Sequence, residues 1–173
     1  VYDAGIGPLI GGYPSSLVDR GNEGDPNTME QSFLQRIVIP PTALITNGAA
    51  YDAATRTLEV SVTADFQMAT SGDWRIGLIL TEDGVTGTNG YAQSNAYAGG
   101  GNGEMGGYEI LPNPVPAAQM VYDHVARTIV PGFDGLVNSF PATIPSGLVA
   151  SNCFSFTLPA DWDETKIHII SFL

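Results

Sequence analysis

The clearest signal in the chain is a strict alternation of apolar and polar residues between Thr57 and Met68. The apolar positions of this run are Leu58, Val60, Val62, Ala64, Phe66 and Met68. Successive side chains of a strand point to opposite faces, so the pattern predicts a long strand with one buried and one solvated face. Such a strand is typical of an antiparallel sheet.

Shorter apolar runs predict the neighbours of this strand. They cover residues 43–45, 74–80, 152–158 and 166–173. We expect Asn47-Gly48 to end the first run, and we expect Gly77 in the second to allow a close approach by a neighbouring element. The predicted fold class is mainly β: an antiparallel β-sandwich, immunoglobulin-like or jelly-roll-like, with one N-terminal helix and a long glycine-rich loop.

The N-terminal helix is predicted over residues 28–38. Asn27 is a good N-cap, and Glu30 stands three residues later, where a capping box requires it. An amphipathic stripe at helical spacing consists of Met29, Phe33 and Ile37. Pro40-Pro41 cannot continue a helix and therefore predicts its end.

Residues 82–116 form a much longer connection than compact domains normally contain, and such loops are functional or disordered. We expect this loop to pack on the domain, because its aromatic rings would be costly to leave in water. Its candidate ligand-binding residues are Tyr91, Asn95, Tyr97, Asn102, Tyr108 and Asn113. The alternative is a loop packed by its own side chains. Residues 117–130 fit both a helix and a half-buried strand, and periodicity does not decide between them.

The composition matters mainly through charge. The 173 residues include 18 acidic and 6 basic side chains, which gives a formal net charge of −12. This balance argues against nucleic-acid partners and anionic membrane surfaces, both of which attract clustered Lys and Arg. The negative net charge is compatible with cation binding, or with an acidic surface whose self-repulsion keeps the protein soluble. The length predicts one domain, or one domain plus a fragment.

The ends of the chain and its cysteine give three further expectations. No run is long and apolar enough to span a bilayer. Val1 is not an initiator methionine, so we expect the chain to start after processing or cleavage. Leu173 ends an apolar strand-like run, so we expect either further sequence after it or a partner for that strand. Cys153 is the only cysteine, which excludes an intrachain disulfide, and its alternating neighbourhood favours a structural strand residue over a nucleophile.

Asp123, His124 and Arg127 form the cluster with the most obvious chemistry, because a histidine beside carboxylates can act as a base or a metal ligand. The alternative is a strand with polar residues on one face and a packed histidine. His168 has the same two interpretations. A metal site made by both histidines would require that their strands pair. No catalytic constellation is recognisable in the sequence.

Asp161, Asp163 and Glu164 are the candidate metal-binding residues, because alternating carboxylates in a turn can bind Ca²⁺ through their oxygen atoms. These residues lack the spacing and the glycine of an EF-hand loop. The alternative is a solvated turn. Glu82 and Asp83, which precede Gly84, have the same two interpretations, and the solvated turn is favoured at both places.

The stretches GGYPSSLVDR, TEDGVTG, MVYDHVAR and FSFTLPADWDETKIHIISFL occur in this order along the chain. They resemble the twenty-eight-kilodalton outer-membrane protein family of Bacteroidetes-type bacteria, and the resemblance covers most of the chain. It implies a thioredoxin-like half followed by a β-sandwich half. It also implies export, often to the cell surface, while no general activity is established for the family.

The resemblance assigns parts of the chain to these two halves. Residues 1–40 would be the tail end of a truncated thioredoxin-like domain, and 41–173 a β-sandwich domain that is incomplete at its C-terminus. Tyr13-Pro14 would be a proline turn, 15–19 the strand after it, and the helix at 28–38 the last helix of that half. The redox cysteine pair of a thioredoxin fold would lie upstream, so thiol–disulfide chemistry is not assigned to this chain. Residues 118–130 would be a strand.

Three functions follow from these expectations. The first is a non-catalytic exported or cell-surface module for binding or assembly, with a protein or glycan partner, secreted or at the outer-membrane surface of a Gram-negative bacterium. The second is a Ca²⁺-stabilised carbohydrate-binding module. The third is a fragment of a secreted hydrolase that uses His124 as a base.

Overall fold

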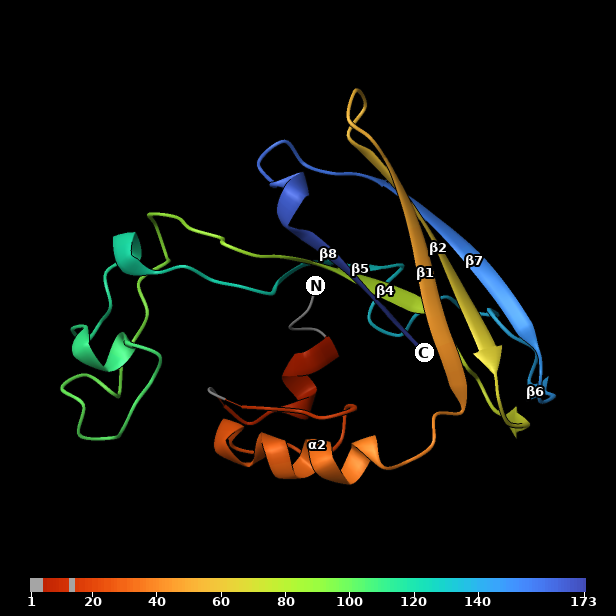
Figure 1. Ribbon diagram of the computed structural model, residues 1–173, viewed down its shortest axis with the longest axis horizontal. Helices are drawn as coiled ribbons and strands as arrows, with labels where there is room; N and C mark the ends of the chain where they lie inside the picture. Colours follow the sequence, from red (N-terminus) through yellow and green to blue (C-terminus); the bar gives the residue numbers. More distant parts are fainter. Residues whose placement is uncertain (1–4, 13–14) are drawn as a thin grey trace. The chain divides into compact units, whose positions relative to one another are not determined.

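The computed structural model describes residues 5–12 and 15–173 and has a mainly β fold with antiparallel sheets, which confirms the predicted class (Figure 1). The strands are β1 (Ala43–Asp52), β2 (Thr57–Phe66), β3 (Thr70–Ser71), β4 (Gly77–Glu82), β5 (Val125–Val130), β6 (Thr143–Ile144), β7 (Val149–Thr157) and β8 (Ile167–Phe172). The helices are α2 (Met29–Ile37) and the 3-10 turns η1 (Gly7–Leu9), η2 (Pro26–Thr28), η3 (Tyr108–Ile110), η4 (Ala117–Gln119) and η5 (Glu164–Lys166).

The chain divides into two compact units. Unit 1 comprises residues 1–79, 128–159 and 169–173, and unit 2 comprises residues 80–127 and 160–168. The predicted domain boundary after residue 40 lies inside unit 1. The strands β4, β5 and β8 form a three-stranded sheet in the order β5-β4-β8.

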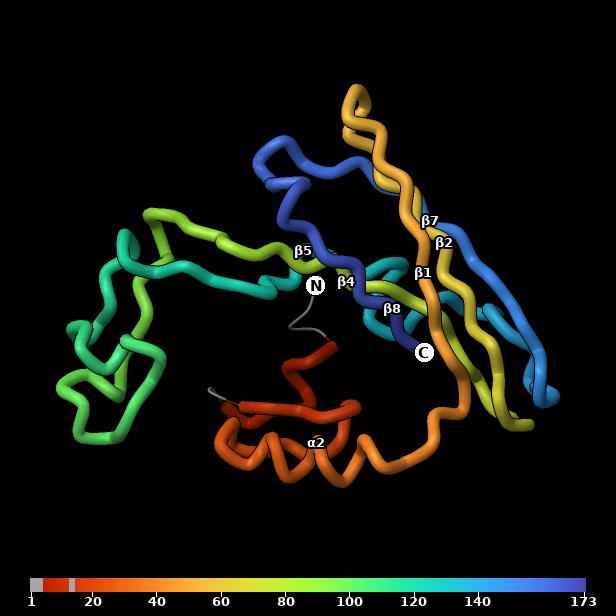
Figure 2. Tube along the Cα trace, viewed as in Figure 1, coloured from red at the N-terminus to blue at the C-terminus, as the bar shows by residue number. Residues whose placement is uncertain are grey.

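The strand β2 is the centre of the other three-stranded sheet, β1-β2-β7, which belongs to unit 1 (Figure 2). Its pairing with both neighbours is antiparallel and without interruption. The buried positions of β2 are Leu58, Val60, Val62, Ala64 and Phe66. The alternation therefore predicted both the strand and its buried face. Met68 lies beyond the end of β2 and is 44% exposed, so its predicted burial is wrong.

Asn47-Gly48 does not end β1, contrary to the prediction. Both residues continue the ladder, with Asn47 opposite Val62 and Gly48 opposite Ser61. The turn comes after Asp52, whose side chain accepts hydrogen bonds from the backbone N–H of Ala54 and from the hydroxyl of Thr55. The cross-strand ladder outweighs the local turn preference of Asn-Gly, because ten consecutive pairs form between β1 and β2.

The core of unit 1 lies against the buried face of β2. The ring of Phe66 makes edge contacts with Trp74 and Phe140, at centroid distances of 5.8 and 5.1 Å. A Cβ atom added to Gly77 would stand 2.5 Å from the ring of Phe172, which confirms the predicted close approach at this glycine. Asn47 Nδ2 donates to Ser171 Oγ at 3.0 Å, so β1 contacts the last residues of β8. Within unit 1 the arrangement is sandwich-like and not closed.

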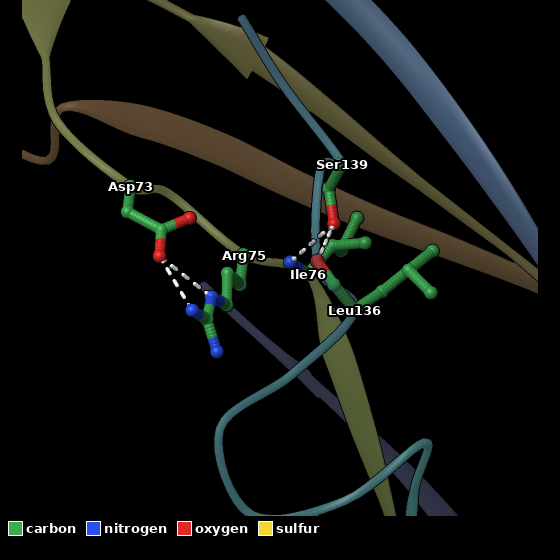
Figure 3. A network of polar contacts seen from close by, with 5 residues as sticks. All are labelled: Asp73, Arg75, Ile76, Leu136 and Ser139. Carbon is green, nitrogen blue, oxygen red and sulfur yellow. Dashed lines mark hydrogen bonds and ion pairs between the residues drawn. The ribbon is translucent and has the colours of Figure 1, made fainter. Parts of the chain in front are cut away.

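A short polar network fixes the chain before β4 (Figure 3). The hydroxyl of Ser139 accepts a hydrogen bond from the N–H of Ile76 at 3.1 Å and donates to the carbonyl of Leu136. Beside it, Arg75 donates from Nε and Nη2 to one oxygen of Asp73, at 2.9 and 2.5 Å. This network holds the 136–139 loop of unit 1 against the start of β4.

The helix α2 begins one residue later than predicted and ends one residue earlier. Asp25, not Asn27, provides the cap: its carboxylate accepts from the N–H of Asn27 and starts the 3-10 turn η2. Thr28, the residue before α2, makes no side-chain capping bond. The amphipathic stripe Met29, Phe33 and Ile37 is 50%, 49% and 61% exposed. The described residues therefore leave the apolar face of α2 largely uncovered.

Two expectations that came from the family resemblance fall near the N-terminus. The strand implied at 15–19 is reduced to one isolated antiparallel bridge between Ser16 and Gly24. The proline turn at Tyr13-Pro14 lies outside the described residues.

In unit 2 the ambiguous segment 117–130 starts as the 3-10 turn η4 and becomes strand only at β5, so the strand expected over 118–130 exists in its second half. The long loop between β4 and β5 is closed by two isolated antiparallel bridges. One joins Val85 to Tyr122 and the other joins Gln93 to Val115. Val115 and Met120 are buried, which anchors this loop within unit 2. Within residues 5–12 and 15–173, no helix has both the length and the apolar character needed to cross a membrane.

Candidate functional site

Unit 2 contains a polar pocket of about 350 Å³, which we call the Glu82–Arg127 pocket. Its lining consists of Glu82, Asp83, Gly84, Val85, Thr86, Tyr91, Arg127, Asp161, Asp163 and Lys166. Three segments that are distant in sequence supply these side chains: the end of β4 with the residues after it, the first half of β5, and the turn before β8. The volume is at the lower end of the range for small-molecule sites, which is roughly 300–1,000 Å³.

The centre of the pocket is a buried pair of opposite charges. The side chain of Glu82 is 7% exposed and that of Arg127 is 18% exposed, and Oε2 and Nε lie 3.0 Å apart. Both atoms are buried, and they face each other in this ion pair. The other oxygen of Glu82 accepts from the N–H of Asp163 at 2.8 Å. Glu82 was expected in a solvated turn, and its burial overturns that expectation.

Arg127 is also held from its other side. Its guanidinium lies 4.8 Å from the ring centroid of Trp162, and Nη2 lies 3.6 Å from Oδ2 of Asp161. A guanidinium over an aromatic face gains electrostatic attraction from the ring quadrupole. The turn before β8 thus fixes Arg127 through one aromatic and one acidic side chain.

Both histidines of the chain contact the carboxylate of Asp83, a residue of the pocket lining. The ring Nδ1 of His124 lies 3.2 Å from Oδ1 of Asp83, and Nε2 of His168 lies 2.9 Å from Oδ2. The imidazole rings are stacked, with centroids 5.8 Å apart and an interplanar angle of 2°. The backbone N–H of His124 also donates to Asp83 at 2.7 Å, from a residue with a left-handed φ of 56°. The sequence raised a metal site made by both histidines, on the condition that their strands pair. The structure brings the two rings together, but β4 lies between β5 and β8.

The contacts of Asp83 favour its ionised form. The backbone N–H of His124 is the largest influence that lowers the pKa of Asp83, followed by the hydrogen bond from His168 and the proximity of both imidazoles. Asp123, the third member of the predicted cluster, has a local role instead: its carboxylate accepts from the N–H of Gly84 at 2.8 Å. The predicted cluster is therefore divided, with His124 at Asp83 and Arg127 in the pocket.

The candidate metal-binding residues do not converge on one point. The carboxylate of Asp163 accepts from the hydroxyl and the N–H of Thr165, at 2.6 and 3.0 Å, and the bond from this hydroxyl is the main cause of its lowered pKa. Asp161 is 77% exposed and lies beside Arg127, and Glu164 belongs to η5. In the ranges 5–12 and 15–173, no group of three or more His, Cys, Asp and Glu side chains is placed so as to hold a metal ion.

The asparagines of the predicted binding loop hold the loop itself. The amide of Asn95 donates to the carbonyls of Tyr108 and Leu111, at 2.7 and 3.2 Å, and its oxygen accepts from the N–H of Tyr97. The side chain of Asn113 accepts from the N–H of Asn95. Asn102 donates likewise to the carbonyl of Ala96. These amides are engaged inside the loop, which agrees with the alternative interpretation of a loop packed by its own side chains.

Of the predicted binding tyrosines, Tyr91 is the one that lines the Glu82–Arg127 pocket. Its ring meets Tyr122 edge-on at 6.0 Å, and its carbonyl accepts a hydrogen bond from the Tyr122 hydroxyl. Tyr97 and Tyr108 are half-buried elsewhere in the loop. The structure therefore connects one of the six predicted loop residues with the charged pocket.

Unit 1 contains a larger hollow of about 700 Å³, which is a weaker candidate. Its charged side chains include Arg20, Asp73, Arg75 and Asp134. Arg75 is already matched by Asp73, as Figure 3 shows, and the guanidinium of Arg20 lies 3.9 Å from the ring centroid of Phe133. None of the buried polar atoms without a hydrogen-bond partner, among the residues the structure describes, belongs to its lining.

Comparison with protein-family models, with curated proteins and with solved structures finds no match to this chain.

Proposed function

We propose that this chain is a non-catalytic binding module whose ligand site is the Glu82–Arg127 pocket. The observation that carries the proposal is the buried pair itself. Glu82 and Arg127 form a buried ion pair, with Oε2 and Nε 3.0 Å apart, in the lining of a pocket of ligand size. Ligand pockets commonly combine a concave lining with a small number of fixed polar groups that orient the ligand.

The surroundings of His124 favour binding over hydrolysis. In the part of the chain that the structure describes, the polar contacts of its ring are with Asp83, and the ring stacks on His168. Nucleophilic catalysis requires a hydroxyl or thiol within hydrogen-bond reach of the base. Among the described residues, the ring contacts of His124 include neither group.

We further propose that the module is exported and acts at a bacterial cell surface, either secreted or at the outer membrane. This proposal rests on the four motifs that resemble the twenty-eight-kilodalton outer-membrane protein family. The acidic composition supports it as well, because a net charge of −12 keeps a protein soluble by self-repulsion. Its partner would be a protein or a glycan of the surface.

The test is a binding titration of the full chain with small sugars of different charge, namely glucose, glucuronate and glucosamine. Backbone NMR shifts locate the site. We expect at least one sugar to shift signals around Glu82 and Arg127, without turnover. Tyr91→Ala should weaken that binding about tenfold, since it removes an aromatic wall of the pocket.

Tyr97→Ala is the matched control, because it removes the same side chain from the same loop outside the pocket lining. Equal affinity of Tyr91→Ala and the unsubstituted chain would contradict the proposed site. If no sugar shifts any signal near Glu82, the pocket is not a ligand site of this kind. Formation of a hydrolysis product from a glycoside would instead support the hydrolase alternative.

A further inference from the structure

The strand β1 lies at one edge of the sheet β1-β2-β7 in unit 1 (Figure 1). Within residues 5–12 and 15–173, β2 is the one segment that forms a β-ladder or bridge with it. The five central residues of β1, 46–50, are all exposed. An edge strand presents a row of unpaired backbone N–H and C=O groups, which is a template for a further strand.

The register shows which residues of β1 direct these groups outward. The N–H of Gln67 donates to the carbonyl of Thr42 at 2.9 Å, and this contact extends the β1–β2 ladder by one hydrogen-bonded pair. Hydrogen-bonded and non-hydrogen-bonded pairs alternate along an antiparallel ladder. The even-numbered residues of β1 therefore bond to β2. The outward groups belong to the odd-numbered residues Ala43, Ile45, Asn47, Ala49 and Tyr51.

This edge lacks the features that usually prevent strand pairing. Residues 43–51 include no charged side chain and no proline, and the ladder to β2 contains no bulge. At the centre of the strand, Gly48, Ala49 and Ala50 have little or no side chain to hinder another backbone. An exposed, regular and uncharged edge of this length is a predicted site of strand addition.

The buried face of the sheet is also incomplete at β1. Val62 and Val60 are at most 1% exposed, but the residues opposite them on β1, Asn47 and Ala49, are exposed. Side chains directly opposite each other in a ladder share one face of the sheet. The cover over β2 therefore ends before the middle of β1, and a further strand there would place its own side chains over the open strip.

The opposite edge of the sheet, β7, differs in this respect. The residues of β7 opposite Val60 and Val62 are Phe154 and Asn152, of which one is buried and the other half-buried. The same face is thus covered at β7 and open at β1. This difference favours β1 as the edge that takes a partner.

A second copy of β1 fits this edge because the strand is self-complementary. In antiparallel pairing about a twofold axis at Asn47, the outward-facing residues of the two copies match completely. Asn47 lies opposite Asn47 of the second copy, Ile45 opposite Ala49, and Ala43 opposite Tyr51, and each such pair exchanges two backbone hydrogen bonds. The one charged residue of β1, Asp52, falls opposite Thr42, so no like charges meet along the strand.

We propose that two copies of this chain associate through their β1 strands and form a continuous antiparallel sheet in the order β7-β2-β1-β1-β2-β7. The inference does not rest on the proposed function, because no residue of β1 lines the Glu82–Arg127 pocket. The net charge of −12 makes two copies repel each other at low ionic strength, and salt screens this repulsion.

Sedimentation equilibrium of the full chain tests the association. We expect the average mass to rise with concentration from that of one chain towards that of two. The association should be at least about threefold tighter in about 500 mM than in about 50 mM NaCl, because screening removes the repulsion between two acidic chains. Pairing with a basic partner would have the opposite salt dependence.

Charges at position 47 test the twofold axis. Asn47→Asp and Asn47→Lys should each weaken self-association about fivefold or more, because each variant places like charges directly opposite each other. An equimolar mixture of the two variants should recover the affinity of the unsubstituted chain, since opposite charges then meet at the axis. The pair Ser155→Asp and Ser155→Lys, on the exposed face of β7, is the matched control and should leave the association unchanged.

Proline substitutions test which edge is used. Ala49→Pro removes an outward N–H from β1 and should weaken the association about tenfold, because each copy loses a hydrogen bond across the interface. Ser155→Pro is the matched control at the other edge. The N–H of Leu158 donates to the carbonyl of Arg56, so the odd-numbered residues of β7 direct their groups away from β2. Thermal melts verify that all variants are folded.

Three results would overturn the inference. One is the mass of a single chain at every concentration up to about 1 mM in both salt solutions. A second is an association that Ser155→Pro weakens and Ala49→Pro does not, because the contact would then use the β7 edge. The third is a mixture of the two Asn47 variants that stays as weak as each variant alone, because the strands then do not meet about Asn47. None of these results bears on the Glu82–Arg127 pocket, whose sugar titration is a separate measurement.

Discussion

The sheet around β2 in unit 1 and the Glu82–Arg127 pocket in unit 2 are held together in different ways. In the sheet, five apolar side chains at alternate positions of one strand are buried, and the neighbouring strands follow in continuous register. In the pocket, single polar contacts join residues about 40 to 80 positions apart in sequence, such as Glu82 with Arg127 and with Asp163. The structure of the sheet follows from a periodic pattern in the sequence. The structure of the pocket depends on individual contacts between side chains that are distant in sequence.

Phe66→Ala should produce the largest loss of stability. The side chain is fully buried and contacts the rings of Trp74 and Phe140. Removal of a buried phenylalanine costs about 3–5 kcal/mol of unfolding free energy, because it removes apolar contacts and leaves a cavity. Urea unfolding measures the loss, and Met68→Ala, beyond the end of the same strand, should cost less than about 1 kcal/mol. Similar losses at both positions would mean that β2 is not the centre of the core.

Glu82→Gln should cost somewhat less, about 2–4 kcal/mol, since it leaves Arg127 without its closest counter-charge in a largely buried position. The double variant Glu82→Leu with Arg127→Met should recover much of that loss, because an apolar pair of similar volume needs no charge compensation. A double-mutant cycle from urea unfolding measures the coupling between the two positions. Independent, additive effects would show that the pair does not act as a unit.

The difference between the regions also explains what the sequence predicted. The alternation from Thr57 to Phe66 predicted both the strand and its buried face, because the period of a strand is a local property. Asn47-Gly48 misled the prediction of β1, since ladder pairing with β2 is a long-range effect that no local turn preference contains. The stripe Met29, Phe33 and Ile37 predicted a helix correctly, but its spacing does not say what covers it.

The candidate site was predicted in pieces. The sequence singled out Arg127, Asp161 and Tyr91 for three separate reasons, and the structure places them in one lining. It missed the role of Glu82, because a carboxylate before a glycine resembles a solvated turn. The available signal was the position of Glu82 at the end of the apolar run that became β4. Its partner could not be inferred, because the strand register that brings Arg127 beside it is not a local property.

Asn95→Ala tests the loop of unit 2 and should have a smaller effect. The buried amide of Asn95 satisfies the carbonyls of Tyr108 and Leu111, and these would lose their partner. The expected cost is about 1–3 kcal/mol, concentrated in local opening of the loop rather than in global unfolding. Amide hydrogen exchange should accelerate around Tyr97 and Tyr108, with unchanged rates in β2. Asn102→Ala, which removes one exposed hydrogen bond, is the matched control. Faster exchange in β2 of the Asn95→Ala variant would show that the loop and the sheet open together.

Asp83 should make the stability depend on pH in the acid range. Hydrogen bonds from His124 and His168 lower the pKa of its carboxyl below the ordinary value of 3.8. A carboxyl whose pKa is lower in the folded state stabilises the fold above its unfolded pKa, and this contribution is lost as the pH falls through the folded value. Asp83→Asn should therefore flatten the decline of the urea midpoint below about pH 4, relative to the unsubstituted chain. Parallel declines in both proteins would show that Asp83 is not held in this way.

Calcium should have the smallest effect of all. The carbohydrate-binding alternative assigns Ca²⁺ to Asp161, Asp163 and Glu164, but the carboxylate of Asp163 already accepts two hydrogen bonds from Thr165. Thermal melts in Ca²⁺ and in EDTA should have midpoints within about 1 °C, because a ligand stabilises a fold only if it binds the native state. A rise of several degrees in Ca²⁺, absent in Mg²⁺ and lost in Asp163→Asn, would contradict this expectation. It would also support the calcium-dependent alternative for the Glu82–Arg127 pocket, because Asp161 and Asp163 line that pocket.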